Sequence, residues 1–190
     1  MTHPIRLPLS LALCLLMLAA RSGHAELSLL PDRNTNIIIA ALNNDLEKVQ
    51  GMLIKGVNPN TVDGDGRTVL IHAATSGNAP LAKLVLDAGA KTTLLDKAGN
   101  SALHYAAERG NVELLRMMLD AKAPPDVLNK QGATPLLIAA GRGRIEVVRL
   151  LIERGASVSK QDFTGRDALS WAQDNRQNGI AQLLRQAGAK

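Results

Sequence analysis

The sequence predicts an all-α protein made of about five helix-turn-helix units that follow one another every 33 residues. Two series of positions keep this step without insertion or deletion: Thr68, Ser101, Thr134 and Asp167, and Gly66, Gly99, Gly132 and Gly165. A short unit copied at a fixed period is the signature of repeats that stack on one another. The composition agrees, because aromatic residues make up only 2% of the chain and aliphatic side chains carry its apolar content.

The stretch 132–155 shows how each unit is expected to fold. Thr134 is a good N-cap, and Pro135 suits the first helical position, where its missing N–H costs nothing. Gly143 is expected to separate this helix from a second one, which has about one apolar residue per turn. Gly155 then suits a left-handed C-terminal cap. Two helices this short cannot bury their apolar faces alone, so each unit needs neighbours.

The units are expected at 30–62, 63–95, 96–128, 129–161 and 162–190, within one domain that spans 26–190. The third unit has Lys122 where the others have a glycine after the second helix. The fifth has a polar second helix, which is what the exposed end of a stack requires. The first is apolar for an end unit, with Ile37, Ile38 and Ile39 in a row, and the leucines of 26–34 are candidates to cover it.

The first 25 residues predict a secretory signal peptide. Arg6 supplies a positive charge, residues 7–20 form an apolar run, and Gly23 and Ala25 provide the small residues that precede a cleavage site. We expect cleavage after Ala25 and a periplasmic or secreted protein with no stable membrane span; a retained signal anchor is the alternative. Cleavage removes Cys14, the one cysteine, so the mature chain would have no disulfide chemistry.

Two segments carry a resemblance to the ankyrin repeat family. Residues 96–107 read Asp-Lys-Ala-Gly-Asn-Ser-Ala-Leu-His-Tyr-Ala-Ala, and residues 143–156 read Gly-Arg-Ile-Glu-Val-Val-Arg-Leu-Leu-Ile-Glu-Arg-Gly-Ala. They are similar to the family's D-x-x-G turn, its T-P-L-H-x-A-A first helix and its second helix. The resemblance covers 35–190 and implies a solenoid of antiparallel helix pairs with β-turn fingers on one side. The chain also resembles the small secreted ankyrin proteins of bacteria.

The mature sequence predicts no catalytic residue, no metal site and no cofactor. His72 and His104 have no cysteine or third ligand at a matching spacing, which argues against zinc. The resemblance implies that His104 takes part in hydrogen bonding within the turns. The series Asp63, Asp96 and Asp162 keeps the 33-residue step, so these carboxylates are expected to make the same turn contact in every unit. The formal net charge of +5 is too small to indicate nucleic-acid binding.

The resemblance implies that the finger tips and the ends of the first helices contact a protein partner. The residues predicted to do so are Arg67, Lys97, Asn100, Glu108, Arg109, Lys130, Gln131, Arg142, Phe163, Arg166 and Gln173. The set is rich in cations, so we expect the unidentified partner to carry an acidic or mixed-charge patch. Tyr105 and Trp171 share one repeat position and are expected to pack in the core or on the floor of a groove.

The leading functional hypothesis is a monomeric, non-catalytic protein-interaction module in the periplasm. Resemblance to secreted bacterial ankyrin proteins suggests two cases: support of a stress-defence enzyme such as a catalase, or an immunity protein that inhibits a secreted toxin. Two other hypotheses stay open at this point. One is an enzyme with an unrecognised site, and the other is self-association through the apolar end at Ile37, Ile38 and Ile39.

Overall fold

The computed structural model describes the backbone of residues 33–189 and the side chains of 37–189. The signal segment, its cleavage site and the leucines at 27, 29 and 30 lie outside these residues. Within them, all secondary structure is α-helical apart from an isolated antiparallel bridge between Val62 and Thr68. The all-α prediction is confirmed. The helices are α3 (Arg33–Leu42), α4 (Leu46–Ile54), α5 (Val69–Ser76), α6 (Ala79–Asp87), α7 (Ala102–Arg109), α8 (Val112–Asp120), α9 (Pro135–Gly141), α10 (Ile145–Glu153), α11 (Ala168–Asp174) and α12 (Asn178–Gln186).

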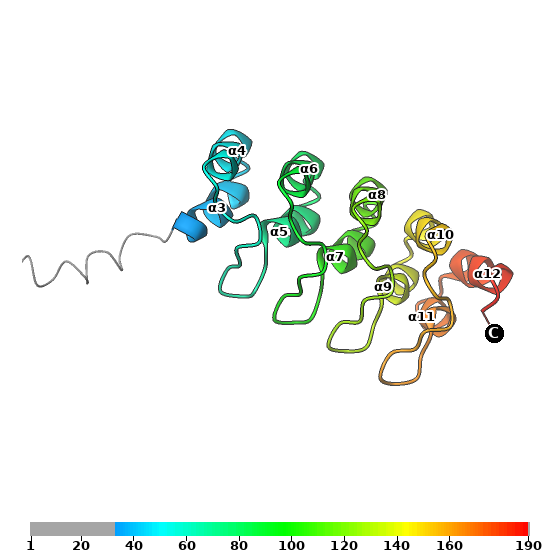
Figure 1. The fold of residues 1–190 in the computed structure, drawn as a ribbon. Helices are drawn as coiled ribbons and strands as arrows, with labels where there is room; N and C mark the ends of the chain where they lie inside the picture. Colours follow the sequence, from blue (N-terminus) through cyan, green and yellow to red (C-terminus); the bar gives the residue numbers. More distant parts are fainter. Residues whose placement is uncertain (1–32, 190) are drawn as a thin grey trace, which may run out of the picture. The chain divides into compact units, whose positions relative to one another are not determined.

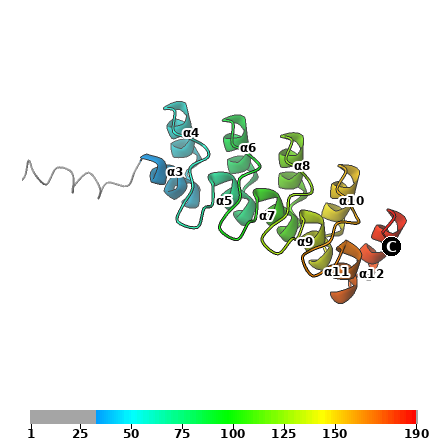
Figure 2. The same cartoon turned by 60° about the horizontal axis from the view of Figure 1, so that its bottom comes forward.

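The helices form two rows, and each unit contributes one helix to each row (Figure 1). The first helices α5, α7, α9 and α11 pack in sequence order, and the second helices α4, α6, α8, α10 and α12 pack in the same order. Loops between one pair and the next extend as fingers on one side of the rows, and Figure 2 shows the same order from a second direction. The fold is therefore the stack of helix pairs that the 33-residue period predicts.

The starts of the first helices follow the predicted capping chemistry. The hydroxyl of Thr134 accepts a hydrogen bond from the backbone N–H of Leu137 at 3.3 Å, and Pro135 is the first residue of α9. Thr68 and Asp167 cap α5 and α11 with the same geometry. Each cap satisfies a backbone donor that a helix of this length would otherwise leave free at its N-terminus.

The core lies between the two rows and repeats with the sequence. Leu70, Leu103 and Leu136 occupy one position in three consecutive units and are at most 1% exposed. The alanines of the first helices, such as Ala106 and Ala139, are fully buried, and their small side chains let neighbouring helices approach closely. Each buried leucine contributes about 1.5–3 kcal/mol, but only because the next unit covers it.

The N-terminal unit does not present the apolar surface of three isoleucines on which the self-association hypothesis depends. Ile37 and Ile38 are buried at 0% and 3% exposure, and only Ile39, at 43%, faces solvent to a substantial degree. The three consecutive isoleucines point in different directions because successive helical residues are about 100° apart. A surface made of all three is therefore not available for self-association.

The fingers are fixed by hydrogen bonds between neighbours. The backbone N–H of Lys130 donates to the carbonyl of Ala98 at 3.3 Å, and the N–H of Phe163 donates to the carbonyl of Gln131 at 3.2 Å. This contact leaves no room for a side chain at Gly132, where a Cβ would lie 2.7 Å from the nitrogen of Phe163 and where φ is +75°. The fingers therefore form one connected row rather than separate loops.

The residue that ends the third helix pair, Lys122, has a left-handed backbone conformation that is unusual for a residue other than glycine. Lys122 has φ +63°, the left-handed region that glycine occupies after the other second helices. The cap is thus preserved without the residue that adopts it at lowest cost.

Among the residues that the structure describes, no helix is long and apolar enough to cross a membrane.

Candidate functional site

The fingers and the first helices together form a surface that we call the inner face. It consists of the finger segments 63–67, 96–100, 129–133 and 162–166 and the solvent-facing residues of α5, α7, α9 and α11 with the residue that follows each helix. The residues predicted to contact a partner fall into two groups on it. Those in the fingers are Arg67, Lys97, Asn100, Lys130, Gln131, Phe163 and Arg166, and those at helix ends are Glu108, Arg109, Arg142 and Gln173.

One carboxylate organises each of three finger turns, as predicted. In the last finger, Oδ1 of Asp162 accepts the backbone N–H groups of Thr164 at 2.8 Å and Arg166 at 3.0 Å. Asp63 and Asp96 make the same pair of bonds in their own fingers. This pattern confirms the prediction that the aspartate series makes Asx-type turn contacts rather than acid–base pairs.

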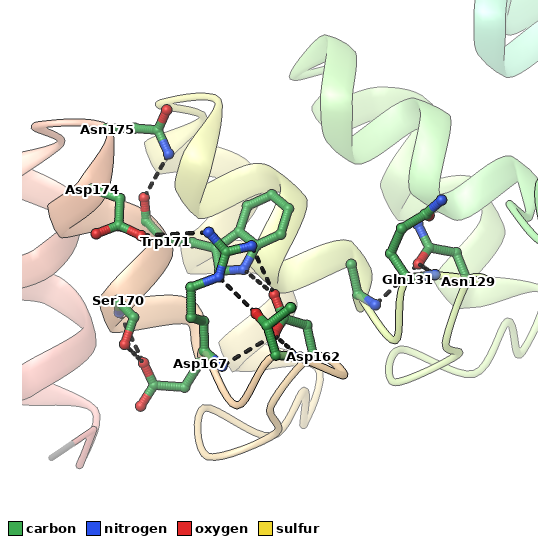
Figure 3. A network of polar contacts seen from close by, with 11 residues as sticks. Asn129, Gln131, Asp162, Asp167, Ser170, Trp171, Asp174 and Asn175 are labelled. Atoms are coloured by element: carbon green, nitrogen blue, oxygen red, sulfur yellow. Dashed lines mark hydrogen bonds and ion pairs between the residues drawn. The ribbon is translucent and has the colours of Figure 1, made fainter.

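The second oxygen of each aspartate ties the finger to its first helix. Oδ2 of Asp162 accepts from the indole N–H of Trp171 at 2.9 Å (Figure 3), and Oδ2 of Asp96 accepts from the hydroxyl of Tyr105 at 2.6 Å. Asp63 contacts the ring nitrogen of His72 at 2.7 Å. Sequence reasoning placed these aromatic residues in the core or groove floor and missed this link. Their constant separation of nine residues from the aspartate was the available signal.

Two of the aromatic rings also carry an arginine. The guanidinium of Arg166 lies 5.2 Å from the centre of the Trp171 ring, and that of Arg67 lies 5.7 Å from the Tyr105 ring. Both arginines also approach the aspartate of the same cluster, Arg166 at 3.2 Å from Asp162 and Arg67 at 3.6 Å from Asp96. Each cluster combines a charge pair with a cation–π contact, so these two cations are already engaged within the protein.

The ionisation of these groups follows from their hydrogen bonds. Burial alone raises the pKa of Asp162, but hydrogen bonds from the Thr164 hydroxyl, the Arg166 backbone and the Trp171 indole outweigh it and hold this pKa well below its usual range. Burial likewise raises the pKa of Asp63, but hydrogen bonds from the Arg67 backbone and the His72 ring outweigh this effect and lower the pKa. Burial and the bond to Asp96 raise the pKa of Tyr105. Asp63 and Asp162 therefore act as fixed anionic acceptors rather than as proton donors.

The predicted cations of the inner face are not equivalent. Arg142 is 61% exposed but pairs with Glu108 at 2.7 Å, which joins the ends of two neighbouring first helices. Lys97, Arg109 and Lys130 are exposed and form no ion pair with another residue of the part that the structure describes. These three side chains are the unpaired positive charge that the inner face presents to solvent.

Comparison with protein families agrees with the geometry. The family model for ankyrin repeats, which spans three copies, matches residues 37–129 and 113–190. The chain belongs to the ankyrin repeat family. Among curated proteins, no significant match to the sequence was found. Ankyrin repeats are protein–protein interaction modules, and the inner face is the surface of this ankyrin protein on which the predicted contact residues gather.

The fourth ankyrin repeat departs from its neighbours at three positions of the inner face. Asn129 replaces the finger aspartate, and Ile138 stands where the second, third and fifth units have His72, Tyr105 and Trp171. The Asn129 amide still accepts the two turn N–H groups, but its nitrogen donates sideways to Asn100 at 2.9 Å. Gly141 is the third departure, and a Cβ there would lie 2.7 Å from Cε3 of Trp171. The sequence comparison grouped Asn129 with the aspartates and did not reveal this combination.

The histidine expected in the turn network has a structural role. The backbone N–H of Ser101 donates to Nδ1 of His104 at 3.1 Å, so Nε2 carries the proton and donates to the carbonyl of Ala133 at 3.1 Å. Ser101 and His104 are each 1% exposed, so a substrate could not reach their contact. Among the described residues, no group of three His, Cys, Asp or Glu side chains could hold a metal ion.

Proposed function

We propose that this ankyrin protein is a non-catalytic module that acts in the periplasm or outside the cell and binds an acidic patch of a protein partner with its inner face. The observation that carries the proposal is the charge of that face. Lys97, Arg109 and Lys130 are exposed there and form no ion pair within the described residues, whereas the other predicted cations are engaged by Asp96, Asp162 or Glu108.

Unpaired surface cations favour encounter with an anionic partner. Their field acts over roughly 8–10 Å at physiological ionic strength, so it speeds association and sets orientation more than it adds affinity. The exposed carboxylate Asp65 lies on a neighbouring finger, so a partner of mixed charge with an acidic majority fits best. The proposed binding should therefore weaken as salt concentration rises.

The rigidity of the inner face supports the same function. The fingers are bonded to one another, and each aspartate cluster ties a finger to its helix. Binding to a surface that is already ordered avoids the entropic cost of fixing loops in the complex. An interaction module gains from such a surface, because its side chains are held in place before the partner arrives.

The proposed location depends on the N-terminal sequence. A positive residue, an apolar run at 7–20 and small residues before Glu26 are the features of a cleaved secretory signal. The full chain, expressed in a bacterium with two membranes, should yield a periplasmic protein whose N-terminal residue is Glu26. Mass spectrometry of the fractionated protein checks this, and a membrane-bound product that retains residues 1–25 would support the signal anchor instead.

Charge reversal tests the binding surface. The variant Lys97→Glu/Arg109→Glu/Lys130→Glu should lose co-purification of the partner from periplasmic extract, while circular dichroism shows the same helix content. A matched control reverses three exposed cations of the second helices, Lys48, Arg116 and Arg185, and should keep the partner. Equal recovery with both variants would show that the inner face is not the binding surface.

The identity of the recovered partner separates the specific roles. A stress-defence enzyme such as a catalase, recovered with higher activity in the presence of the ankyrin protein, would indicate a supporting role. A secreted toxin whose activity is suppressed would indicate an immunity protein. Both roles use the same surface, so the charge-reversal variant should abolish either effect.

A further inference from the structure

The three residues by which the fourth repeat departs from its neighbours line a depression in the inner face. Its volume is about 400 Å³. Ile138 is one of its lining residues, a branched aliphatic side chain where the two neighbouring units hold Tyr105 and Trp171. Gly141 has no side chain, which lets the Trp171 ring pack against the helix end, because a Cβ at Gly141 would lie 2.7 Å from Cε3 of Trp171. Depressions of similar volume lie beside the second and third repeats, and the combination of Asn129, Ile138 and Gly141 in the lining distinguishes this one.

The walls have the chemistry of a site for an apolar side chain. Tyr105 and Trp171 are half-buried, and their polar atoms are bonded to Asp96 and Asp162, which leaves ring surface toward the depression. Arg67 and Arg166 each lie over one of these rings and hold it in place. An aliphatic residue between two aromatic rings favours the binding of an apolar partner side chain, because that side chain is then removed from water.

The rim has the chemistry of a site for polypeptide backbone. Asn100, Gln131 and Asn175 surround the depression with amide groups that both donate and accept hydrogen bonds. The side-chain amide of Gln131 makes no hydrogen bond to another described residue, and Asn175 uses only its nitrogen, toward the carbonyl of Trp171. The charged residues on the rim, Glu108 and Arg142, are paired with each other. The rim therefore suits an uncharged peptide group rather than an ion.

Charge beyond the rim determines which peptide fits. Lys130 precedes Gln131 in the same finger, Lys97 lies in the adjacent finger, and Arg109 follows Glu108. None of these unpaired cations lines the depression, but Lys130 and Arg109 adjoin lining residues in the sequence, and Lys97 lies in the same finger as the lining residue Asn100. A segment that places one apolar side chain in the depression would bring its neighbouring residues close to these cations.

We propose that the depression of the fourth repeat binds one apolar side chain, of leucine to phenylalanine size, from an extended partner segment with acidic residues on both sides of it. This inference rests on the proposed function, because it specifies what the inner face recognises. The apolar side chain packs on Ile138 between the two aromatic rings. Gln131 and Asn175 bond its backbone, and the flanking carboxylates face Lys97, Lys130 and Arg109.

A direct test uses the one tryptophan of the chain, Trp171, as the reporter. The probe is a capped heptapeptide with a central leucine, two aspartates on each side and a glycine at each end. It should change Trp171 fluorescence saturably, in the micromolar to millimolar range. A peptide with glycine in place of leucine should bind about tenfold more weakly or worse, and one with lysines in place of aspartates should give no saturable change. Equal binding of the leucine and glycine peptides would overturn the proposal.

A filled variant tests the location. Ile138→Tyr puts into the fourth repeat the side chain that Tyr105 supplies in the third, so the fold has room for it while the depression does not. It should weaken binding of the leucine peptide at least about tenfold with an unchanged circular dichroism spectrum. If this variant is poorly folded, Asn129→Asp/Ile138→Tyr restores the full pattern of the neighbours and is measured instead. Ile54→Tyr makes the same change at a side chain that is 79% exposed on α4 and should bind as the parent does.

The outcomes separate this inference from the proposed function. Leucine-peptide binding that survives filling of the depression overturns the inference, while loss of partner recovery in the charge-reversal variant still supports the function. Partner recovery that survives charge reversal overturns the function. Loss of peptide binding on filling, together with loss of partner on charge reversal, supports both.

Discussion

The indole N–H of Trp171 donates a hydrogen bond of 2.9 Å to Oδ2 of Asp162, nine residues earlier in the chain. The other oxygen of the same carboxylate accepts the backbone N–H groups that close the finger turn. One side chain thus joins a β-turn to the helix that follows it. Tyr105 and Asp96 repeat the arrangement two units earlier. The inner face is therefore held by polar contacts in addition to the buried core.

Removal of the indole N–H should destabilise the fold measurably. Trp171→Phe keeps an apolar ring at this position but deletes the donor to a buried carboxylate, so the free energy of unfolding should fall by about 1–3 kcal/mol. Urea denaturation followed by circular dichroism measures the change. In an Asp162→Asn background the same substitution should cost less, because the acceptor is no longer charged. Equal losses in both backgrounds would show that this hydrogen bond does not contribute.

Acid should weaken the fold through the same carboxylate. The pKa of Asp162 is lower in the folded protein than in the unfolded chain, where it is about 4. Its contribution is therefore complete above about pH 4 and is lost as the pH falls toward the folded-state pKa. Asp63, whose pKa is also lowered, acts in the same direction. The free energy of unfolding, measured between about pH 5 and pH 2, should fall less steeply for Asp162→Asn than for the parent; identical slopes would contradict this account.

The fold could be predicted from the sequence because its rules are local and repeated. A cap residue such as Thr134, a proline after it and a left-handed turn at Gly155 act within a few residues of one another, and the 33-residue step copies them. Stacking then follows, because one unit alone cannot bury its apolar face. The conformation of Lys122, at φ +63°, was likewise implied by the glycines at the same position in other units.

The inner face could be predicted less completely, since its features depend on contacts between positions. The sequence showed which residues vary, but not that Arg142 is paired with Glu108 while Lys130 has no ion pair in the described part of the chain. It also grouped Asn129 with the aspartates. Only the structure shows that Asn129 and Ile138 line one depression together with Trp171. Side-chain geometry across neighbouring units decides these points, and a repeat period carries no information about it.

A glycine at the end of the third helix pair should stabilise the protein. Lys122 adopts φ +63°, which costs a residue with a Cβ more than it costs glycine. Glycine also gains freedom in the unfolded chain, so Lys122→Gly should raise the free energy of unfolding by only about 0.5–1 kcal/mol. Lys122→Ala keeps the Cβ and should change stability by less. Thermal denaturation of the three proteins decides, and a lower melting temperature for Lys122→Gly than for Lys122→Ala would contradict the strain argument.

His104 should make stability depend on pH in the neutral range. Burial lowers the pKa of His104 below its ordinary value of about 6.5, which the unfolded chain keeps. The unfolded state therefore binds a proton first as the pH falls, and the stability that neutral His104 provides is complete above about pH 6.5 and decreases below it. The parent protein should lose unfolding free energy between about pH 7 and pH 5.

The substitution His104→Gln isolates this effect. Glutamine can accept the N–H of Ser101, as in a capping box, but it does not titrate and does not reproduce the bond to Ala133. At about pH 8 the variant should be less stable than the parent by about 1 kcal/mol. The difference should shrink as the pH falls to about 5, because only the parent loses stability through this group. Urea denaturation at several pH values gives both curves, and a constant difference across the range would show that His104 does not titrate differently in the folded and unfolded states.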